Sequence, residues 1–479
     1  MKFFTTLLFF CLTLQFSVFS QELVSSAFLG SKSKADLTAE FGINIFKNGV
    51  DYYKLTYTTL DVHGVQDTAS GLLAIPDVLS KVYPLLVYQH GTVASKDNVP
   101  SNLEADWEIT VIYAGVGYVS LTPDYLGLRE SRGFHPYMHA ASEASAAVDM
   151  MRAAKEFAAN NDVFINEQVF VSGYSQGGHA AMALFRELET NLSDEFEVTA
   201  ATPMSGPYSI SGVMRDLILR EEEYFTPSYL PNTMLSYQTV YDNIFNNLED
   251  LFKPAYVPAI DDYFNGTIDL LDLNTQLIDK LIENEGASIP IFMFQDDVIN
   301  SVKNDPNDPI NVDLRDNDVF DWTPQAPTRM YYCGADEQVP FENSILADSV
   351  MNANGAPDVG AFNLNPNASH FGCVLPAIST GIFFFSIFQR IDQATATVET
   401  SAPAPFQIFP NPVQNNLFVK EIPAEGELLL YDLNGRTYSS LHLQKGDNEL
   451  DVAALPTGLY IAEIRTGGAI WHRKIIVGN

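Results

Sequence analysis

Short apolar runs that end in turn-forming residues recur along the first two thirds of this chain and constrain its fold most strongly. They occupy residues 83–91, 118–124, 169–173, 198–206 and 329–334. Such runs are typical of strands buried on both faces of a parallel sheet. Helical stretches separate them, and the clearest is the alanine-rich segment 139–160, which contains no glycine or proline. The alternation predicts an α/β fold, with a mostly parallel sheet and helices on both faces.

Two other segments of this region follow different patterns. Residues 52–75 alternate apolar and polar side chains around His63-Gly64, which predicts antiparallel strands joined by a turn. Residues 210–321 contain no convincing strand, but the pieces 233–252 and 268–285 have the apolar spacing of amphipathic helices. We therefore expect an inserted helical cap over 210–321, with most of its aromatic residues in its own core.

The chain of 479 residues is too long for one ordinary domain. Residues 1–20 contain Lys2, an apolar run, and the small residues Val18 and Ser20 before a predicted cleavage site, which is typical of a secretory signal peptide. The run is short for a transmembrane helix, and no other stretch is long and apolar enough. We expect an α/β domain over residues 21–391.

The C-terminal part changes in composition. Residues 392–404 are small, polar and proline-containing, as in a linker. Residues 405–479 carry the hairpin signals Asn434-Gly435 and Gly467-Gly468, which predict a small all-β sandwich.

The charge of the chain limits its partners. Sixty acidic residues against 26 lysines and arginines give a formal charge of −34. Such an acidic surface argues against nucleic acid and anionic membranes. The acidic run 304–318 lacks the ligand spacing of a known calcium loop, so we expect a solvated surface there and no metal or cofactor.

A serine lies where the strand at 169–173 turns into an alanine-rich helix. Ser175 stands between Gly173 and Gly177, and the tight turn would hold it exposed in a strained conformation while the glycines let strand and helix pass closely. The backbone N–H of Gln176, at the helix start, would point toward a developing negative charge. This context predicts that Ser175 is a nucleophile in a nucleophile elbow.

The partners of Ser175 follow from the chain order of such sites, which is serine, acid, histidine. His370 is the only late histidine before the linker. The residues after the strand at 329–334 offer Asp336 as the acid, with Glu337 as the less favoured alternative. The acid would orient the imidazole of His370, which would take the proton from Ser175.

The loop after the strand at 83–91 is predicted to complete an oxyanion hole. We expect the N–H of Thr92 to be the second donor beside Gln176, with Gly91 allowing close approach. We expect His90 to have a structural role in this loop, because it precedes the serine.

Two cysteines remain after removal of the predicted signal peptide. Cys333 lies three residues before Asp336, and Cys373 lies three residues after His370. If the acid and the histidine touch, their cysteines are neighbours, and a disulfide between them is possible in an exported protein. Two buried free thiols are the alternative.

Several motifs together resemble the secretory lipase family of α/β-hydrolases over residues 35–390. They are GYSQGGHAA, TPDYLGL, HPYMHAASEASAAVDMMRAA, SGPYS and SYLPNTMLSYQTVY. The resemblance implies a carboxylic-ester hydrolase with a helical cap over its pocket, and it matches Ser175, Asp336 and His370. Asp124 and Tyr125 fall in a motif that we interpret as loop structure near the pocket.

The tail resembles a type IX secretion C-terminal sorting domain. The matching motifs are FQIFPNPVQNNLFV, LYDLNGR and LPTGLYIAEI. The resemblance implies contact with the type IX machinery, export across the outer membrane, and a secreted or surface-attached product. A carbohydrate-binding module is the alternative, but the tail lacks an evident platform of exposed aromatics.

These features favour a secreted lipase or esterase that acts through an acyl-enzyme on an ester or lipid substrate. The aromatic insert favours an apolar acyl group, because a cap that excludes water creates the pocket that such groups need. A serine exopeptidase of the same fold is an alternative. It would need a charged anchor for a peptide terminus or a propeller domain, and no propeller repeat is visible. Acyl transfer to an acceptor other than water shares the first half of the mechanism, and a non-catalytic binding protein is a further alternative.

Overall fold

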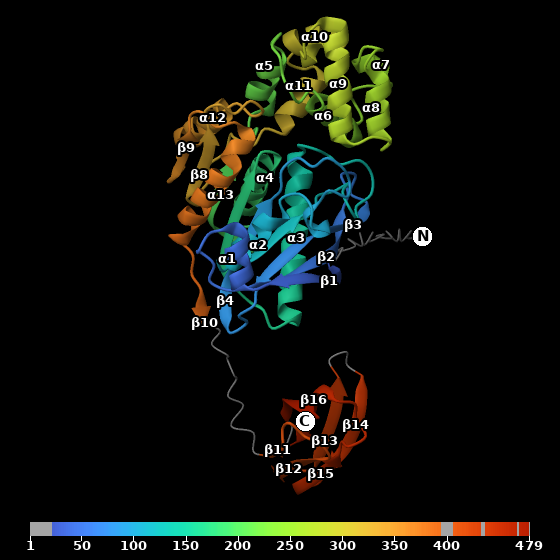
Figure 1. The fold of residues 1–479 in the computed structure, drawn as a ribbon, viewed down its shortest axis with the longest axis vertical. Helices are drawn as coiled ribbons and strands as arrows, with labels where there is room; N and C mark the ends of the chain where they lie inside the picture. Colours follow the sequence, from blue (N-terminus) through green and yellow to red (C-terminus); the bar gives the residue numbers. More distant parts are fainter. Residues whose placement is uncertain (1–21, 394–405, 433–435, 467–468, 479) are drawn as a thin grey trace, which may run out of the picture. The chain divides into compact units, whose positions relative to one another are not determined.

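The computed structural model describes residues 22–393, 406–432, 436–466 and 469–478. The chain divides into two units, Met1–Ala394 and Thr395–Asn479 (Figure 1). The predicted signal peptide, most of the predicted linker and the two hairpin dipeptides of the tail lie outside the described residues.

A mixed sheet forms the centre of the first unit, with strand order β1-β2-β3-β5-β4-β6-β7-β8-β9. The neighbours from β5 to β9 in this order run parallel, whereas β1, β2, β3 and β5 are joined by antiparallel pairing. The strands are β1 (Leu23–Lys32), β2 (Val50–Leu60), β3 (Gln66–Pro76), β4 (Lys81–Gln89), β5 (Val119–Pro123), β6 (Phe164–Tyr174), β7 (Glu197–Met204), β8 (Thr328–Cys333) and β9 (Val359–Asn365).

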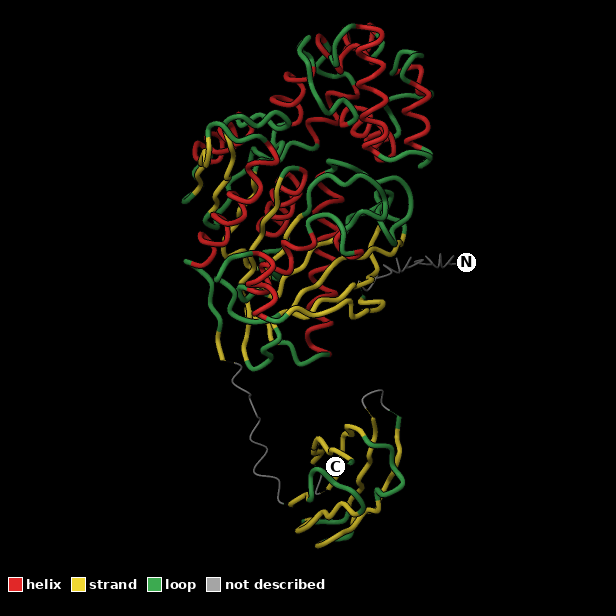
Figure 2. Tube along the Cα trace, in the orientation of Figure 1, coloured by secondary structure: helices red, strands yellow, loops and turns green. Residues whose placement is uncertain are grey.

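Helices cover both faces of this sheet (Figure 2). The core on one face joins the strands to α3 (Ala140–Asn160), α4 (Gln176–Asn191) and α12 (Glu342–Ala353). The core on the other face joins them to α1 (Lys34–Phe41), α2 (Trp107–Gly115) and α13 (His370–Ser386), and a short 3-10 turn, η1 (Pro100–Asn102), precedes α2. The predicted α/β fold with helices on both faces is confirmed.

The central strands show why apolar runs were a strong signal. In β4, Leu85 and Val87 belong to the core on one face, and Leu86 and Tyr88 belong to the core on the other. All four are fully buried. A strand with both faces covered needs apolar residues at every position, so it cannot show the alternation of a half-exposed strand.

The cap is one continuous insertion between β7 and β8 (Figure 1). Its helices are the π-helical turn η2 (Ile210–Met214), α5 (Arg215–Ile218), α6 (Tyr229–Tyr241), α7 (Leu248–Leu251), α8 (Val257–Phe264), α9 (Leu270–Glu285), η3 (Pro290–Met293), α10 (Asp296–Asn304) and α11 (Pro309–Asp316). They share a core of their own, in which Tyr237 is fully buried. Phe225 lies outside this core, with 66% of its surface exposed.

The predicted helix over 233–252 is wrong in its extent. The structure has α6, which ends where Asp242 adopts a left-handed conformation with φ of 52°, and then the separate turn α7. The side chain of Gln238 caps the break, because its Oε1 accepts the N–H groups of Ile244 and Phe245. The apolar spacing continues through this break, so periodicity alone did not reveal it.

The first unit also extends slightly beyond the predicted start of the linker. Asp392 and Gln393 form β10, which pairs antiparallel with the first residues of β4. β5 pairs with β4 only from Leu85 onward. The backbone groups of β4 before Leu85 are therefore not paired with β5, and β10 pairs with Lys81 and Val82 there. Asp392 and Gln393, which the composition assigned to the linker, are therefore strand residues of the first unit.

The second unit consists of two antiparallel sheets that enclose one apolar core. One sheet has the order β11-β12-β15 and the other β14-β13-β16-β17. The strands are β11 (Gln407–Phe409), β12 (Asn416–Ile422), β13 (Gly426–Asp432), β14 (Thr437–Leu443), β15 (Gly446–Asp451), β16 (Gly458–Thr466) and β17 (Ala469–Val477). The predicted β-sandwich is confirmed.

Candidate active site

Ser175 lies in the turn between β6 and α4, in a conformation that few non-glycine residues adopt. Its φ is 61° and its ψ is −124°. The strand and the helix approach so closely that a Cβ on Gly173 would lie 2.0 Å from the carbonyl oxygen of Gly177. A Cβ on Gly177 would lie 1.9 Å from the carbonyl oxygen of Gln89. Only glycine fits at either position, so the two glycines make the strained serine turn possible.

The structure brings the three residues predicted for catalysis into one hydrogen-bonded chain. Nε2 of His370 lies 2.9 Å from Oγ of Ser175, and its Nδ1 lies 2.7 Å from Oδ2 of Asp336. The side chains of His370 and Asp336 are 3% and 1% exposed. Since the carboxylate can only accept, Nδ1 carries the hydrogen and Nε2 of the neutral ring is free to accept from the serine hydroxyl.

The loop after β8 fixes the carboxylate of Asp336. Its other oxygen, Oδ1, accepts the backbone N–H groups of Gln338 and Val339 at 3.0 and 2.8 Å. The alternative acid, Glu337, has a different contact, because its Oε2 accepts the backbone N–H of His370 at 3.0 Å. Glu337 therefore holds the start of α13, whereas Asp336 faces the imidazole ring.

A disulfide joins the two loops that carry the acid and the histidine. It links Cys333, at the end of β8, to Cys373, in the first turn of α13, and both residues are fully buried. Their Cα atoms lie 5.9 Å apart. Asp336 and His370 are thus held by a covalent bond as well as by their hydrogen bond.

The predicted oxyanion donors come from two segments, since Gln176 follows Ser175 at the start of α4 and Thr92 lies in the loop after β4. Among the described residues, no hydrogen bond occupies the backbone N–H of Thr92 or Gln176. The N–H of Gly91 is occupied, since it donates to Oδ2 of Asp106 at 2.9 Å. A Cβ on Gly91 would lie 4.0 Å from Cβ of Ser175, so the missing side chain leaves open space beside the serine.

A buried polar network behind Ser175 was missed in the sequence. Nε2 of Gln176 contacts Oε1 of Glu143 at 3.1 Å and Nε2 of His135 at 3.0 Å. His179 lies 2.7 Å from the other oxygen of Glu143 and 2.8 Å from the carbonyl of Asn317. Burial lowers the pKa of His135 to about 4, so its Nε2 remains an acceptor for Gln176 at neutral pH. The network holds the first turn of α4 through the side chains of Gln176 and His179.

A signal for this network was present in the sequence. Glu143 is a charged residue on the buried side of an alanine-rich helix, and His179 lies four residues after the serine. Buried ionisable residues are rare unless they are paired. Glu143 and His179 in these positions therefore each indicate a buried polar partner.

Ser175 and Gln176 form part of the lining of an apolar cavity beneath the cap. The empty space measures about 1030 Å³, part of it open to solvent. Most of its lining comes from cap residues, among them Met214, Leu219, Tyr229, Met234, Ile291 and Phe294. The one charged side chain among the described lining residues is Arg215, which is bonded to Asn311 and Asp216. The cavity can hold an apolar chain whose end reaches Ser175.

The cap is bonded to the loop that carries the acid. Tyr224 donates its hydroxyl to the carbonyl of Gln338 at 3.1 Å, and Tyr229 donates to the side-chain oxygen of the same residue at 3.0 Å. On the opposite side, the hydroxyl groups of Thr92 and Tyr137 lie 3.0 Å apart. These bonds fix the cavity walls relative to the serine.

Asp124, Tyr125 and His90 are buried behind the oxyanion loop. Asp124 accepts from the hydroxyl of Ser70 at 2.6 Å and from the backbone of Ser101 at 3.0 Å. The hydroxyl of Tyr125 donates to the carbonyl of His90 at 3.1 Å, and the two rings lie 4.2 Å apart. None of these side chains contacts Ser175 or His370 by a hydrogen bond within the described residues.

In the part of the chain that the structure describes, no group of three or more His, Cys, Asp or Glu side chains is arranged to hold a metal ion. Likewise, none of the described helices combines the length and apolar character needed to cross a bilayer.

The comparisons with known proteins concern both units. Residues 407–478 match the family model of the secretion system C-terminal sorting domain. No curated protein sequence gave a significant match. The structure is similar to that of the rice cell wall degrading esterase LipA from Xanthomonas oryzae, with 30% identity and a TM-score of 0.69, over 77% of this chain and 98% of LipA.

Two further solved structures share the fold. A putative hydrolase from Legionella pneumophila has 24% identity and a TM-score of 0.70, over 77% of this chain and 98% of its own. Candida antarctica lipase A has 16% identity and a TM-score of 0.57, over 75% of this chain and 82% of its own.

Proposed function

The chain belongs to the LipA-like esterases of the α/β-hydrolase fold, and on this basis we propose that it hydrolyses carboxylic esters through an acyl-enzyme on Ser175. The observation that carries the proposal is the hydrogen-bonded chain from Oγ of Ser175 through His370 to Asp336. It stands on a strained strand-to-helix turn, at the end of an apolar cavity. Each part of this arrangement has a role in ester cleavage.

In the first step, Oγ of Ser175 attacks the carbonyl carbon of the ester while Nε2 of His370 takes the hydroxyl proton. Asp336 stabilises the charged imidazole. When the intermediate collapses, the C–O bond to the alcohol breaks and the alcohol leaves with the proton from His370. Water then attacks the acyl-enzyme and gives a proton to His370. The bond between the acyl carbon and Oγ of Ser175 breaks, His370 returns the proton to Oγ, and the carboxylic acid is released.

The negative oxygen of each intermediate requires donors that are already in position. We assign this role to the backbone N–H groups of Gln176 and Thr92, which have no partner among the described residues. The bonds of the Gln176 side chain to Glu143 and His135 orient its backbone. Gly91 leaves the space through which the substrate approaches.

The substrate class follows from the cavity. Its lining is almost wholly apolar, so we propose that it takes the acyl chain of the ester, as in the breakdown of lipids. Arg215 is the one charged side chain among the described lining residues, and its two terminal nitrogens bond to Asn311 and Asp216. The cavity therefore favours an ester over a peptide.

The C-terminal sorting domain marks the chain for export by a secretion system. We propose that residues 1–20 direct the chain across the inner membrane, and that residues 405–479 then direct it through the type IX machinery to the surface or the medium. The disulfide fits this route, because such bonds persist in oxidising compartments.

The function is tested with p-nitrophenyl esters from acetate to palmitate. We expect measurable kcat/KM, with a maximum at a medium or long chain that fills the cavity. Ser175→Ala is expected to lower kcat by about 10⁴-fold or more, because the nucleophile is lost. The matched control is Ser193→Ala, an exposed serine just beyond α4, which should leave kcat unchanged.

Two outcomes would contradict the proposal. Equal activity of Ser175→Ala and the parent would show that another residue is the nucleophile. Serine-dependent cleavage of aminoacyl-naphthylamides without cleavage of any ester would identify a peptidase.

A further inference from the structure

Four large apolar residues are exposed along the outward side of α13. The exposed fractions are 75% for Phe371, 71% for Leu375, 71% for Phe383 and 66% for Ile387, which follows the helix. They stand on a ridge of every fourth position that only Ser379 interrupts, and soluble proteins expose single apolar residues often but rarely a cluster of large ones. This face, defined by these four residues, is here called the α13 face.

The polar groups between these residues do not need water. Ser379 and Ser386 are exposed on the same side of the helix. Ser379 donates its hydroxyl to the carbonyl of Leu375 at 2.7 Å, and Ser386 donates to that of Phe383 at 2.6 Å. Both hydroxyls are satisfied within the helix, so covering the α13 face would leave neither of them without a partner.

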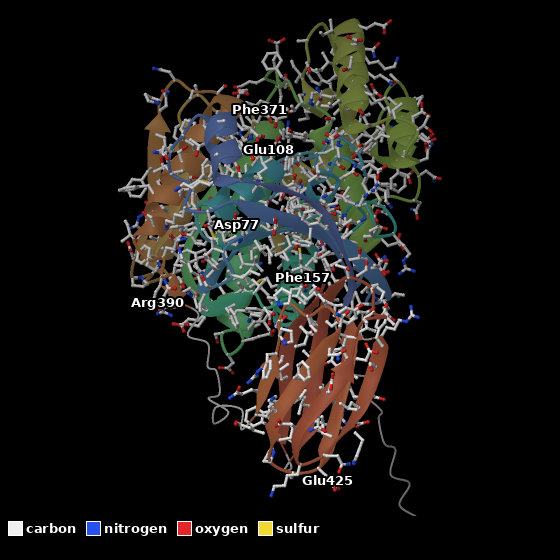
Figure 3. The ribbon with its side chains drawn as sticks, turned by 60° about the horizontal axis from the view of Figure 1, so that its bottom comes forward. Asp77, Glu108, Phe157, Phe371, Arg390 and Glu425 are labelled. Carbon is white, nitrogen blue, oxygen red and sulfur yellow. A yellow bond between two sulfur atoms is a disulfide. The ribbon has the colours of Figure 1, made fainter. Side chains whose placement is uncertain are left out.

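The α13 face is also free of charge. No Asp, Glu, Lys or Arg occurs between Asp358 and Arg390, although 18% of the chain is charged. Phe371 and Arg390, which follows the helix, are labelled in Figure 3. Arg390 bonds to Glu167 and Asp392. The helix spans about 24 Å from Phe371 to Ile387 at 1.5 Å per residue.

The charge of the chain indicates what can cover this face. With a formal charge of −34, the protein is repelled by anionic lipid and by a second copy of itself. An uncharged apolar surface meets no such repulsion. Aromatic and branched apolar side chains on a helix can enter the outer few ångströms of such a surface while the helix lies along it.

The α13 face begins at the site. His370 is the first residue of α13, and its ring lies 5.8 Å from that of Phe371. A surface in contact with Phe371 would therefore lie one residue from the imidazole that contacts Ser175. This continuity links the face to the ester substrate more closely than to an unrelated partner.

We propose that the α13 face docks the protein on the surface of uncharged ester lipid, such as a droplet of triacylglycerol. This rests on the proposed function, because the ester in the droplet is the substrate. Docking raises the concentration of lipid at the site without occupying the apolar cavity beneath the cap. Anionic vesicles bind less than neutral droplets.

The test measures adsorption separately from hydrolysis. Full-length Ser175→Ala protein is mixed with a trioleoylglycerol emulsion, so that the droplets are not consumed, and the bound fraction is measured after flotation. In this background, Leu375→Ser, Phe383→Ser and Ile387→Ser together are expected to lower the partition coefficient at least about tenfold, because three large apolar groups no longer enter the lipid. Phe371 is left unchanged because it touches His370.

The matched control places serine at Phe225, Leu271 and Ile282, which are exposed apolar residues of the cap. This variant is expected to bind droplets like the parent. When the same three α13 substitutions are made in a chain that keeps Ser175, this variant should hydrolyse dissolved p-nitrophenyl butyrate at the parent rate. That rate shows that the variant is folded.

Three results would overturn the proposal. The first is equal droplet binding by the α13 variant and the parent. The second is loss of binding in the cap control instead. The third combines two measurements: the parent elutes as a dimer in size-exclusion chromatography, whereas the α13 variant elutes as a monomer and still binds droplets. The α13 face would then join two copies of the chain. If the parent protein, which keeps Ser175, binds droplets but cleaves no ester, the proposed function fails while the docking proposal stands.

Discussion

Ser175 has a backbone conformation that costs a non-glycine residue about 1–3 kcal/mol. Its neighbours help to hold it there, since its N–H donates to the carbonyl of Met204 at 3.1 Å and the following residues start α4. The conformation exposes Oγ to His370 and places the N–H of Gln176 beside it. A serine with an ordinary φ at this position would present neither its Oγ to His370 nor the N–H of Gln176 beside it.

The pair Asp336 and Glu337 allows a sharp prediction about the acid. Asp336→Asn is expected to lower kcat about 10⁴-fold, because an amide does not stabilise the charged imidazole and favours the wrong tautomer. Glu337→Gln is expected to lower kcat by less than about tenfold, because an amide oxygen still accepts the N–H of His370. Steady-state kinetics on p-nitrophenyl butyrate measures both.

Circular dichroism melts of the two variants serve as the folding control. A larger loss in Glu337→Gln than in Asp336→Asn, with both variants folded, would assign the catalytic acid to Glu337 instead.

At this scale, the sequence predicted which residues to examine but not all of their contacts. Ser175, Asp336 and His370 could be proposed because their order and the turn around the serine follow from the chemistry. The network of Gln176, Glu143 and the histidines could not be proposed, because it joins side chains from distant segments. Which buried polar groups meet depends on how α3 packs against α4, and local patterns do not determine that.

Among the elements, α3 contains a buried carboxylate that opposes stability at neutral pH. Oδ2 of Asp149 accepts from the hydroxyl of Thr59, on β2, at 2.8 Å. Burial nevertheless raises the pKa of Asp149 from 3.8 to about 6. A raised pKa in the folded state means that folding favours the protonated acid. The penalty is therefore complete above pH 6 and fades as the pH falls toward 3.8.

Replacing this group with a neutral one is expected to stabilise the protein in a pH-dependent way. Asp149→Asn keeps an acceptor for Thr59 and should raise the free energy of unfolding by about 1–3 kcal/mol at pH 8, with about half that gain at pH 5. Urea unfolding at both pH values measures it. Asp279→Asn, at an exposed position of α9, is the control and should show no gain. A gain of equal size at both pH values would disprove the electrostatic cause.

The strands differed in how well they could be predicted. The buried strands β4 to β8 were evident from apolar runs, since both of their faces are covered. The edge strands β1 and β9 were missed, because most of their side chains are exposed or only partly buried and their composition is that of a loop. An edge strand is defined by its backbone pairing with the neighbour, and that pairing leaves little trace in side-chain hydropathy.

For the whole molecule, the two units have hydrophobic cores made of separate residues. We therefore expect a chain that ends at Ala394 to hydrolyse dissolved esters with kcat/KM within about twofold of the full chain. In a host with a type IX system, the same truncated chain should remain in the periplasm. Esterase activity in fractionated cells and medium measures both effects.

The control for export is the full-length parent chain, whose esterase activity should appear in the medium or at the surface. Activity of the truncated chain in the medium would show that residues 395–479 are not required for export.

The division into two units was indicated by a change in composition near residue 392, together with the β-rich motifs that follow it. The cleavage after residue 20 stays a prediction. The substrate chain length could not be predicted, because the cavity depends on how the cap helices pack over Ser175.

The cap is one uninterrupted stretch between β7 and β8, while Ser175, Asp336 and His370 all lie outside it. Mutations within this stretch can reshape the cavity and leave the reacting atoms where they are. Selection can therefore change which esters are cleaved without rebuilding the chemistry. Divergence among relatives should be concentrated in the cap, and exchanging caps between them should transfer chain-length preference.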